Sequence, residues 1–125
     1  MAFTTGLIIN QTTSPGPTIA QSVIVGVIND NPQFTASVEL IVFRVIAGNI
    51  RLPAGQDLFN LTPNKMFFKT YTLVNAIAYE VQLDYFSATN VALSVFGVDQ
   101  AGNFVQNQRV LTPELTRIDQ LSSVT

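Results

Sequence analysis

The chain lacks cysteine, histidine and tryptophan, and only 11% of its 125 residues are charged. Without cysteine it forms no disulfide and has no thiolate nucleophile. Without histidine, neither a Ser–His nor a Cys–His catalytic pair can be built. The usual zinc sites draw on the same two residue types. The sequence therefore predicts no catalytic residues, no metal site and no cofactor.

The charges that are present are few and scattered. The net charge is −2, and the six basic residues stand singly along the chain, so there is no basic patch for nucleic acid or an anionic membrane. The longest apolar run, residues 40–50, contains Arg44 and is too short to span a bilayer. No basic segment followed by an apolar one opens the chain, so we expect no Sec-type signal peptide. We predict no nucleic-acid partner and no membrane partner.

Uncharged polar residues take the place of charge. Thr, Asn, Gln and Ser occupy 39 of the 125 positions. A surface of such side chains can pack against another protein without stranding ions. The composition therefore favours self-association, and the alternative is a polar secreted domain with low charge.

Two-residue periodicity runs through most of the chain. It is clearest in residues 78–87, where Tyr79, Val81 and Leu83 alternate with polar residues, which predicts a half-buried strand with a wet outer face. Seven to eight such runs, separated by turn residues, recur at spacings of roughly 8–14 residues. The pattern predicts an all-β fold, an antiparallel jelly-roll or β-sandwich of about 8 strands in residues 19–125. After Thr112-Pro113 the sequence fits a helix or an edge strand, and both remain open.

One strand is apolar on both faces, at Leu40, Ile41, Val42 and Phe43. A strand of this kind is covered on both sides. The cover is either another subunit, which would make these four residues subunit-facing, or a long loop of the same chain.

Asn and Asp residues in two turns, residues 29–31 and 99–103, offer oxygen ligands of the kind that calcium binds. The same side chains commonly hydrogen-bond to the backbone of turns. We favour the turn interpretation.

The first 18 residues form an arm with a pattern of its own. Phe3, Leu7 and Ile9 alternate with other residues, and Ile8 completes the apolar segment. A spacer with Pro15, Gly16 and Pro17 follows, and prolines keep such a segment extended. We predict a connector arm in residues 1–18, held away from the domain in residues 19–125. The arm would donate a strand to a neighbouring copy, fold back into its own sheet, or remain a disordered tail.

The closing part of the chain also resembles a known family. The residues that carry the resemblance are Ala78-Tyr79-Glu80-Val81-Gln82, Ser94-Val95-Phe96-Gly97-Val98-Asp99, Gly102-Asn103 and Gln108-Arg109-Val110-Leu111. They resemble small β-sandwich proteins of spore-forming bacilli, and the layout of a connector before a jelly roll is similar to the subunits of endospore appendages.

The resemblance implies a helical homopolymer on the spore surface, in which connectors dock onto neighbouring subunits and an anchor or tip protein is a further partner. Such proteins are made in the mother cell, which would explain an extracellular protein without a signal peptide. Connector cysteines that cross-link some appendages are missing from this chain. We therefore expect a structural subunit of a non-covalent extracellular fibre that donates its N-terminal strand. The alternatives are a small soluble β-sandwich module that binds carbohydrate or a surface partner, and a jelly-roll coat protein of a virus or phage.

Overall fold

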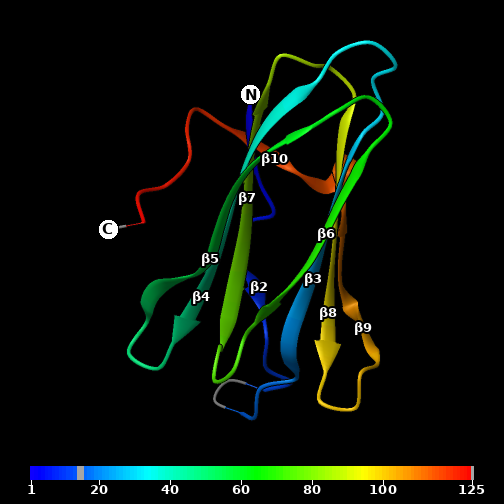
Figure 1. The fold of residues 1–125 in the computed structure, drawn as a ribbon. Coiled ribbons are helices and arrows are strands. Elements are labelled where there is room, and N and C mark those ends of the chain that lie inside the picture. The colour runs from blue at the N-terminus through cyan, green and yellow to red at the C-terminus, as the bar shows by residue number, and fades with distance from the viewer. Residues whose placement is uncertain (14–15, 125) are drawn as a thin grey trace.

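The computed structural model describes residues 1–13 and 16–124 and is an antiparallel β-sandwich (Figure 1), which confirms the predicted fold class. In chain order the elements are β1 (Ala2–Thr4), β2 (Ile8–Ile9), β3 (Ala20–Asn29), β4 (Ala36–Ile46), β5 (Ile50–Leu61), β6 (Met66–Thr72), β7 (Ala78–Phe86), β8 (Val91–Asp99), β9 (Phe104–Leu111), the 3-10 turn η1 (Thr112–Glu114) and β10 (Thr116–Ile118). Ten strands replace the expected eight, chiefly because the arm and the C-terminal segment contribute short strands of their own.

The strands form two layers. The six-stranded sheet has the order β10-β1-β7-β4-β5, with β2 also pairing with β7, and the four-stranded sheet has the order β6-β3-β8-β9. Neighbouring strands are antiparallel throughout both sheets. The four-stranded sheet is the right-hand layer in Figure 1.

Alternating residues of the central strands form the core between the sheets. On β3, Val23, Val25 and Val27 are fully buried and pack against Leu40 of β4 and Tyr79 of β7. The predicted inward face of residues 78–87 is therefore confirmed at Tyr79. Branched and aromatic side chains at every second position suit a pleated surface with one face in the core.

Strand β5 runs without a break through Pro53-Ala54-Gly55, residues of the types that commonly mark a turn. Its pairing with β4 has a register shift where Val42 pairs with Gly55 and Phe43 with Pro53. A proline is tolerated here because β5 lies at the edge of its sheet and its outer side needs no N–H donor. A side chain at position 55 would overlap the ring of Tyr71, so glycine permits the close approach.

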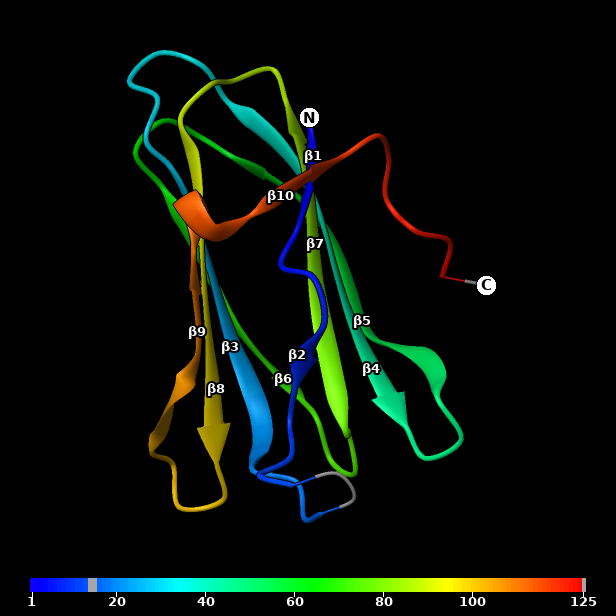
Figure 2. The same ribbon diagram turned by 180° about the vertical axis from the view of Figure 1, so that it is seen from behind.

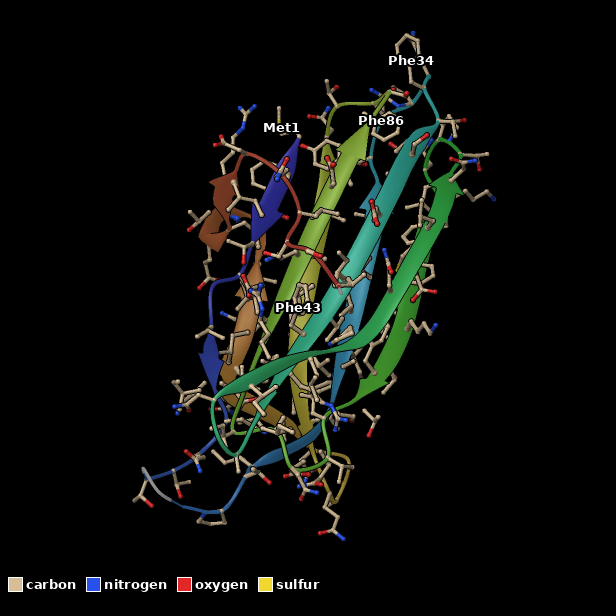
Figure 3. All side chains as sticks on the ribbon, turned by 90° about the vertical axis from the view of Figure 1, so that its left-hand side faces the viewer. Met1, Phe34, Phe43 and Phe86 are labelled. Carbon is tan, nitrogen blue, oxygen red and sulfur yellow. The ribbon has the colours of Figure 1, made fainter. Side chains whose placement is uncertain are left out.

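The C-terminal segment combines parts of both predicted alternatives. Residues 112–114 form a single 3-10 turn, and the chain then extends as β10. Beyond β10 it crosses the outer face of the six-stranded sheet, seen from that side in Figure 3. There the backbone N–H of Ser122 donates to Oε1 of Gln82 at 2.8 Å.

The strand that is apolar on both faces is also covered on both faces. Leu40 and Val42 lie in the core, whereas Ile41 and Phe43 lie on the outer face, where they are only 2% and 1% exposed. The guanidinium of Arg51 sits 4.4 Å above the ring of Phe43. The chain itself thus covers both faces, in agreement with the loop alternative, and these four residues offer no exposed surface to a subunit.

Candidate assembly site at the N-terminal arm

The arm lies along β7 of its own chain. β1 is inserted between β7 and β10, with Phe3 opposite Leu83 of β7 and Arg117 of β10 (Figure 2). Two backbone hydrogen bonds continue the pairing beyond β1, from Thr5 N to Val81 O at 3.0 Å and from Asn10 N to Ile77 O at 2.8 Å. The expectation of an arm held away from the body is therefore wrong for the single chain, which adopts the fold-back alternative.

A bulge inside the arm reverses which side chains face the core. Phe3 and Ile8 are five positions apart, whereas their partners Leu83 and Tyr79 are four apart, so the arm contains one extra residue. Gly6, with φ of +70°, lies within this stretch. An extra residue in one strand of a pair is a β-bulge, and glycine readily adopts a positive φ.

The bulge changes which residues of the predicted alternation share a face. Phe3 and Ile8 face inward, where Phe3 stacks on Tyr85 with ring centroids 6.0 Å apart and Ile8 packs against the core. Leu7 and Ile9 are 60% and 62% exposed. Unbroken alternation had placed Leu7 and Ile9 on the same side as Phe3, and Gly6 was the signal that the alternation breaks.

The amino terminus fixes one end of the arm. The ammonium group of Met1, labelled in Figure 3, lies 3.0 Å from Oδ1 of Asp84 and donates to the carbonyl oxygen of Tyr85 at 2.9 Å. Both partners of the ion pair are partly exposed, so its contribution to stability is small. Its effect is mainly to set the register of β1 on β7.

A polar cluster on the outer face joins the arm to other parts of the chain. Glu80 of β7 is only 8% exposed, and its carboxylate accepts hydrogen bonds from Thr4 of the arm and from Gln82. Arg51 of β5 completes the cluster with an ion pair of 3.1 Å to Glu80. Buried charge of this kind is stable only when it is paired and hydrogen-bonded. The predicted wet outer face of residues 78–87 is wrong at Glu80 and Gln82, because the arm and the C-terminal segment cover them.

The other end of the arm is held by Asn10, which is fully buried. Its Nδ2 donates to the carbonyl oxygens of Ala20 and Ala76, both at 2.9 Å. Its Oδ1 accepts from the N–H of Ala20 and from Nε2 of Gln108, both at 2.8 Å. Gln108 in turn accepts from the hydroxyl of Tyr79 at 2.8 Å. This network links the arm to both sheets, and a period-two pattern contains no signal for it.

The predicted spacer is a closed loop rather than an extended connector. Gln11 and Thr18 form a β-bridge, and Nε2 of Gln11 donates to the carbonyl oxygen of Gly16 at 2.8 Å. A Cβ at position 16 would lie 2.6 Å from the carbonyl oxygen of Thr13, so this turn requires glycine. Of the three predicted spacer residues, Gly16 and Pro17 lie in the loop and Pro15 lies outside the described residues.

In the two turns considered for calcium, side-chain oxygens accept hydrogen bonds from backbone N–H groups. Oδ1 of Asn31 accepts from the N–H groups of Gln33 and Phe34, and Oδ1 of Asp99 accepts from those of Ala101 and Asn103. These are the bonds of the favoured turn interpretation. Among residues 1–13 and 16–124, no group of three acidic side chains is placed to hold a metal ion.

The described part of the chain contains no helix long and apolar enough to cross a membrane. Strands β7 and β10 form the two sides of a slot that β1 of the arm fills. No protein-family model matches the chain, and no curated protein matches it either.

Proposed function

We propose that this chain is a structural subunit that joins non-covalently to copies of itself by passing its N-terminal arm into the slot of a neighbour. The supporting observation is the insertion of β1 between β7 and β10, strands that lie far from it in sequence. A neighbour's arm can make the same contacts in the same slot. Exchange of an identical element between copies is a low-cost route to assembly.

The contacts of the arm supply the free energy that would hold two copies together. Phe3 and Ile8 are partly buried, so each contributes less than the roughly 1.5–3 kcal/mol of a fully buried side chain, before entropic costs. Each main-chain hydrogen bond along β7 adds about 0.5–1.5 kcal/mol. An exchanged arm makes the same contacts as an arm held in its own chain. The difference in free energy between monomer and assembly therefore depends on the loop and on protein concentration.

The loop can supply the reach that exchange needs. Eight residues, 11–18, separate Asn10 from Ile19, and fully extended they span roughly 26 Å. Opening this loop breaks the bridge between Gln11 and Thr18 and the contacts of Asn10 with Ala20. The contacts of Asn10 with Ala76 and Gln108 can form again in the neighbour.

Arms passed head to tail make a heterologous contact, which does not close on itself unless the rotation forms a ring. The product is then an open-ended fibre. The low charge of the chain and its resemblance to endospore appendage subunits support this form. The extracellular setting, the spore surface and an anchor or tip protein rest on the resemblance alone.

A disulfide lock tests the proposal. Met1 exchanges backbone hydrogen bonds with Tyr85, so the adjacent pair, Ala2 and Asp84, is a non-hydrogen-bonded pair with Cα atoms about 4.5 Å apart, within disulfide range. The chain has no other cysteine. Ala2→Cys with Asp84→Cys, oxidised as a dilute monomer, ties the arm to its own body. We expect fibres in electron micrographs of the reduced double variant and none from the locked chain.

Fibres that form equally well from the locked chain would contradict arm exchange. Isolated domains from the reduced variant and from the unmodified chain would favour the soluble binding module. Closed shells would favour the coat protein.

A further inference from the structure

The outer face of the four-stranded sheet carries a continuous apolar surface. The outward residues of β3 are Ile24, Gly26 and Ile28, and the register places Gly26 between Phe68 of β6 and Ser94 of β8. We name this surface the apolar face, and it consists of Ile24, Gly26, Ile28, Met66, Phe68, Ala92, Ser94, Phe96 and Phe104. Met66, Phe68 and Phe104 are 62%, 66% and 63% exposed.

One charged side chain, Arg109 of β9, borders the apolar face, where it lies opposite Phe96. The strands β3, β6 and β8 contain only two charged residues. Nζ of Lys69 turns to Asp57 of β5, and Asp99 accepts hydrogen bonds within its turn. The outer face of the six-stranded sheet, in contrast, carries Glu39, Glu80 and Asp84. In Figure 1 no described segment crosses the apolar face.

The area of the apolar face is close to the least that an interface between two proteins needs. An aromatic or similarly large side chain presents about 200 Å², so Met66, Phe68 and Phe104 together expose about 400 Å². The partly buried Ile24 and Phe96 raise this total to about 450–550 Å², within the range for the largest patch on a monomer. Two such faces in contact bury about 900–1,100 Å², close to the roughly 1,000 Å² that a specific interface needs.

The face carries both an exposed aromatic ring and a groove. Gly26 has no side chain, and a groove of about 250 Å³ runs beside it, lined in part by Met66, Phe68 and Phe96. A cavity of about 150 Å³ holds a benzene ring. Phe68 is therefore an exposed ring next to a groove that admits a ring.

We propose that the apolar face binds the same face of a second copy of this chain, about a two-fold axis near Gly26. Each Phe68 ring then fills the groove of the partner copy. Two sheets that pack face to face lie about 10 Å apart with strands turned by about 30°. This isologous contact uses the four-stranded sheet, whereas arm exchange uses the six-stranded one, so either proposal can fail without the other.

Sedimentation of the full-length chain tests the contact, with the arm held in its own body by the oxidised Ala2→Cys, Asp84→Cys lock. We expect the locked chain to form dimers. Phe68→Glu should raise the dissociation constant about 30-fold or more, the effect of a central interface residue. The matched control is Phe86→Glu, because Phe86 is 60% exposed on the six-stranded sheet (labelled in Figure 3), and it should leave the dissociation constant unchanged. A locked chain that stays monomeric at about millimolar concentration, or equal effects of both variants, overturns the proposal.

A single cysteine tests the two-fold symmetry. Ser94 lies beside Gly26, and a residue near a two-fold axis faces its own copy. Ser94→Cys in the otherwise unmodified chain should therefore form a disulfide-linked dimer on mild oxidation. Ser37→Cys, on the six-stranded sheet, is the control and should not. Cross-linking of Ser94→Cys that is no faster than that of Ser37→Cys overturns the two-fold arrangement.

Discussion

Nε2 of Gln108 donates a hydrogen bond to Oδ1 of Asn10 over 2.8 Å, although 98 residues separate the two along the chain. Both side chains are buried, and through them the arm is joined to β9 of the opposite sheet. Among the residues that the structure describes, each buried side-chain nitrogen or oxygen has a hydrogen-bond partner. The end of the arm is therefore anchored by polar contacts rather than by apolar packing.

Replacement of Asn10 should destabilise the whole domain. Asn10→Ala leaves Gln108 and the backbone of Ala20 and Ala76 without their partners. An orphaned buried polar group costs about 1–3 kcal/mol, so we expect a loss of about 2–4 kcal/mol in the free energy of unfolding. Urea denaturation measures it. Asn107→Ala, at an exposed position, should change it by less than about 0.5 kcal/mol, and equal losses would refute the anchoring role.

The adjacent residues Ile8 and Ile9 lie on opposite faces of the arm, so substitutions at the two positions test the faces separately. Ile8→Asp places a charge against the core and should lower the unfolding free energy by about 3 kcal/mol, the transfer term plus the cost of burying a polar group. Ile9→Asp changes a residue that is 62% exposed and should cost less than about 0.5 kcal/mol. Amide hydrogen exchange along residues 1–10 should report arm release for Ile8→Asp alone. The reverse order would show that the bulge is misplaced.

The bulge itself depends on Gly6. At φ of +70° an alanine is strained, so Gly6→Ala should destabilise the chain by about 1–2 kcal/mol. No atom lies within 4 Å of the position that Cβ would take, so the substitution measures backbone strain without a steric clash. Gly6→Asn is the matched variant and should cost less, because asparagine tolerates this conformation better. Thermal unfolding of the two variants gives the comparison, and identical midpoints would argue against backbone strain.

Stability should fall in alkali. Burial raises the pKa of Tyr79 well above its usual value near 10, and burial together with the hydrogen bond and charge of Asp57 raises the pKa of Tyr71. Below about pH 10 these phenols are protonated in both states and add no slope. Above it, the unfolded chain loses protons that the folded chain retains, so the unfolding free energy declines with rising pH.

A variant of Tyr79 is the control for the fall of unfolding free energy above pH 10. Each fully retained proton contributes at most about 1.4 kcal/mol per pH unit, and we expect Tyr79 to approach this limit. Tyr79→Phe removes the titrating group and should make the decline of unfolding free energy above pH 10 shallower, whatever its effect on stability at neutral pH. Urea denaturation from pH 8 to pH 12 measures both slopes. An unchanged slope in the variant would contradict a raised pKa for Tyr79.

The sandwich was predictable because its strands carry their own local pattern. Alternation in β7 and turn residues between the strands identify the elements without knowledge of their partners. These features depend only on residues that are neighbours in sequence, so they identify the strands before the tertiary contacts are known.

The placement of the arm and its contacts was not predictable in the same way. One extra residue at the bulge turns Leu7 and Ile9 outward, and a period-two pattern contains no information on where pairing slips. The burial of Glu80 depends on Thr4, Arg51 and the C-terminal crossing, which come together only in the folded chain. Which polar residues are buried depends on segments that are distant in sequence and cover them in the fold. Local periodicity contains no information on these segments.

The most direct test of arm exchange is to assemble the Ala2→Cys, Asp84→Cys chain under reducing conditions, oxidise the assemblies, and separate them on a denaturing gel without reductant. If arms pass between copies, each disulfide joins two chains, and a ladder of covalent multimers appears. Either single variant has one thiol per chain and yields nothing larger than a dimer. A single monomer band with both thiols oxidised, from fibres confirmed by electron microscopy, would show that each arm remains in its own chain and would contradict the account.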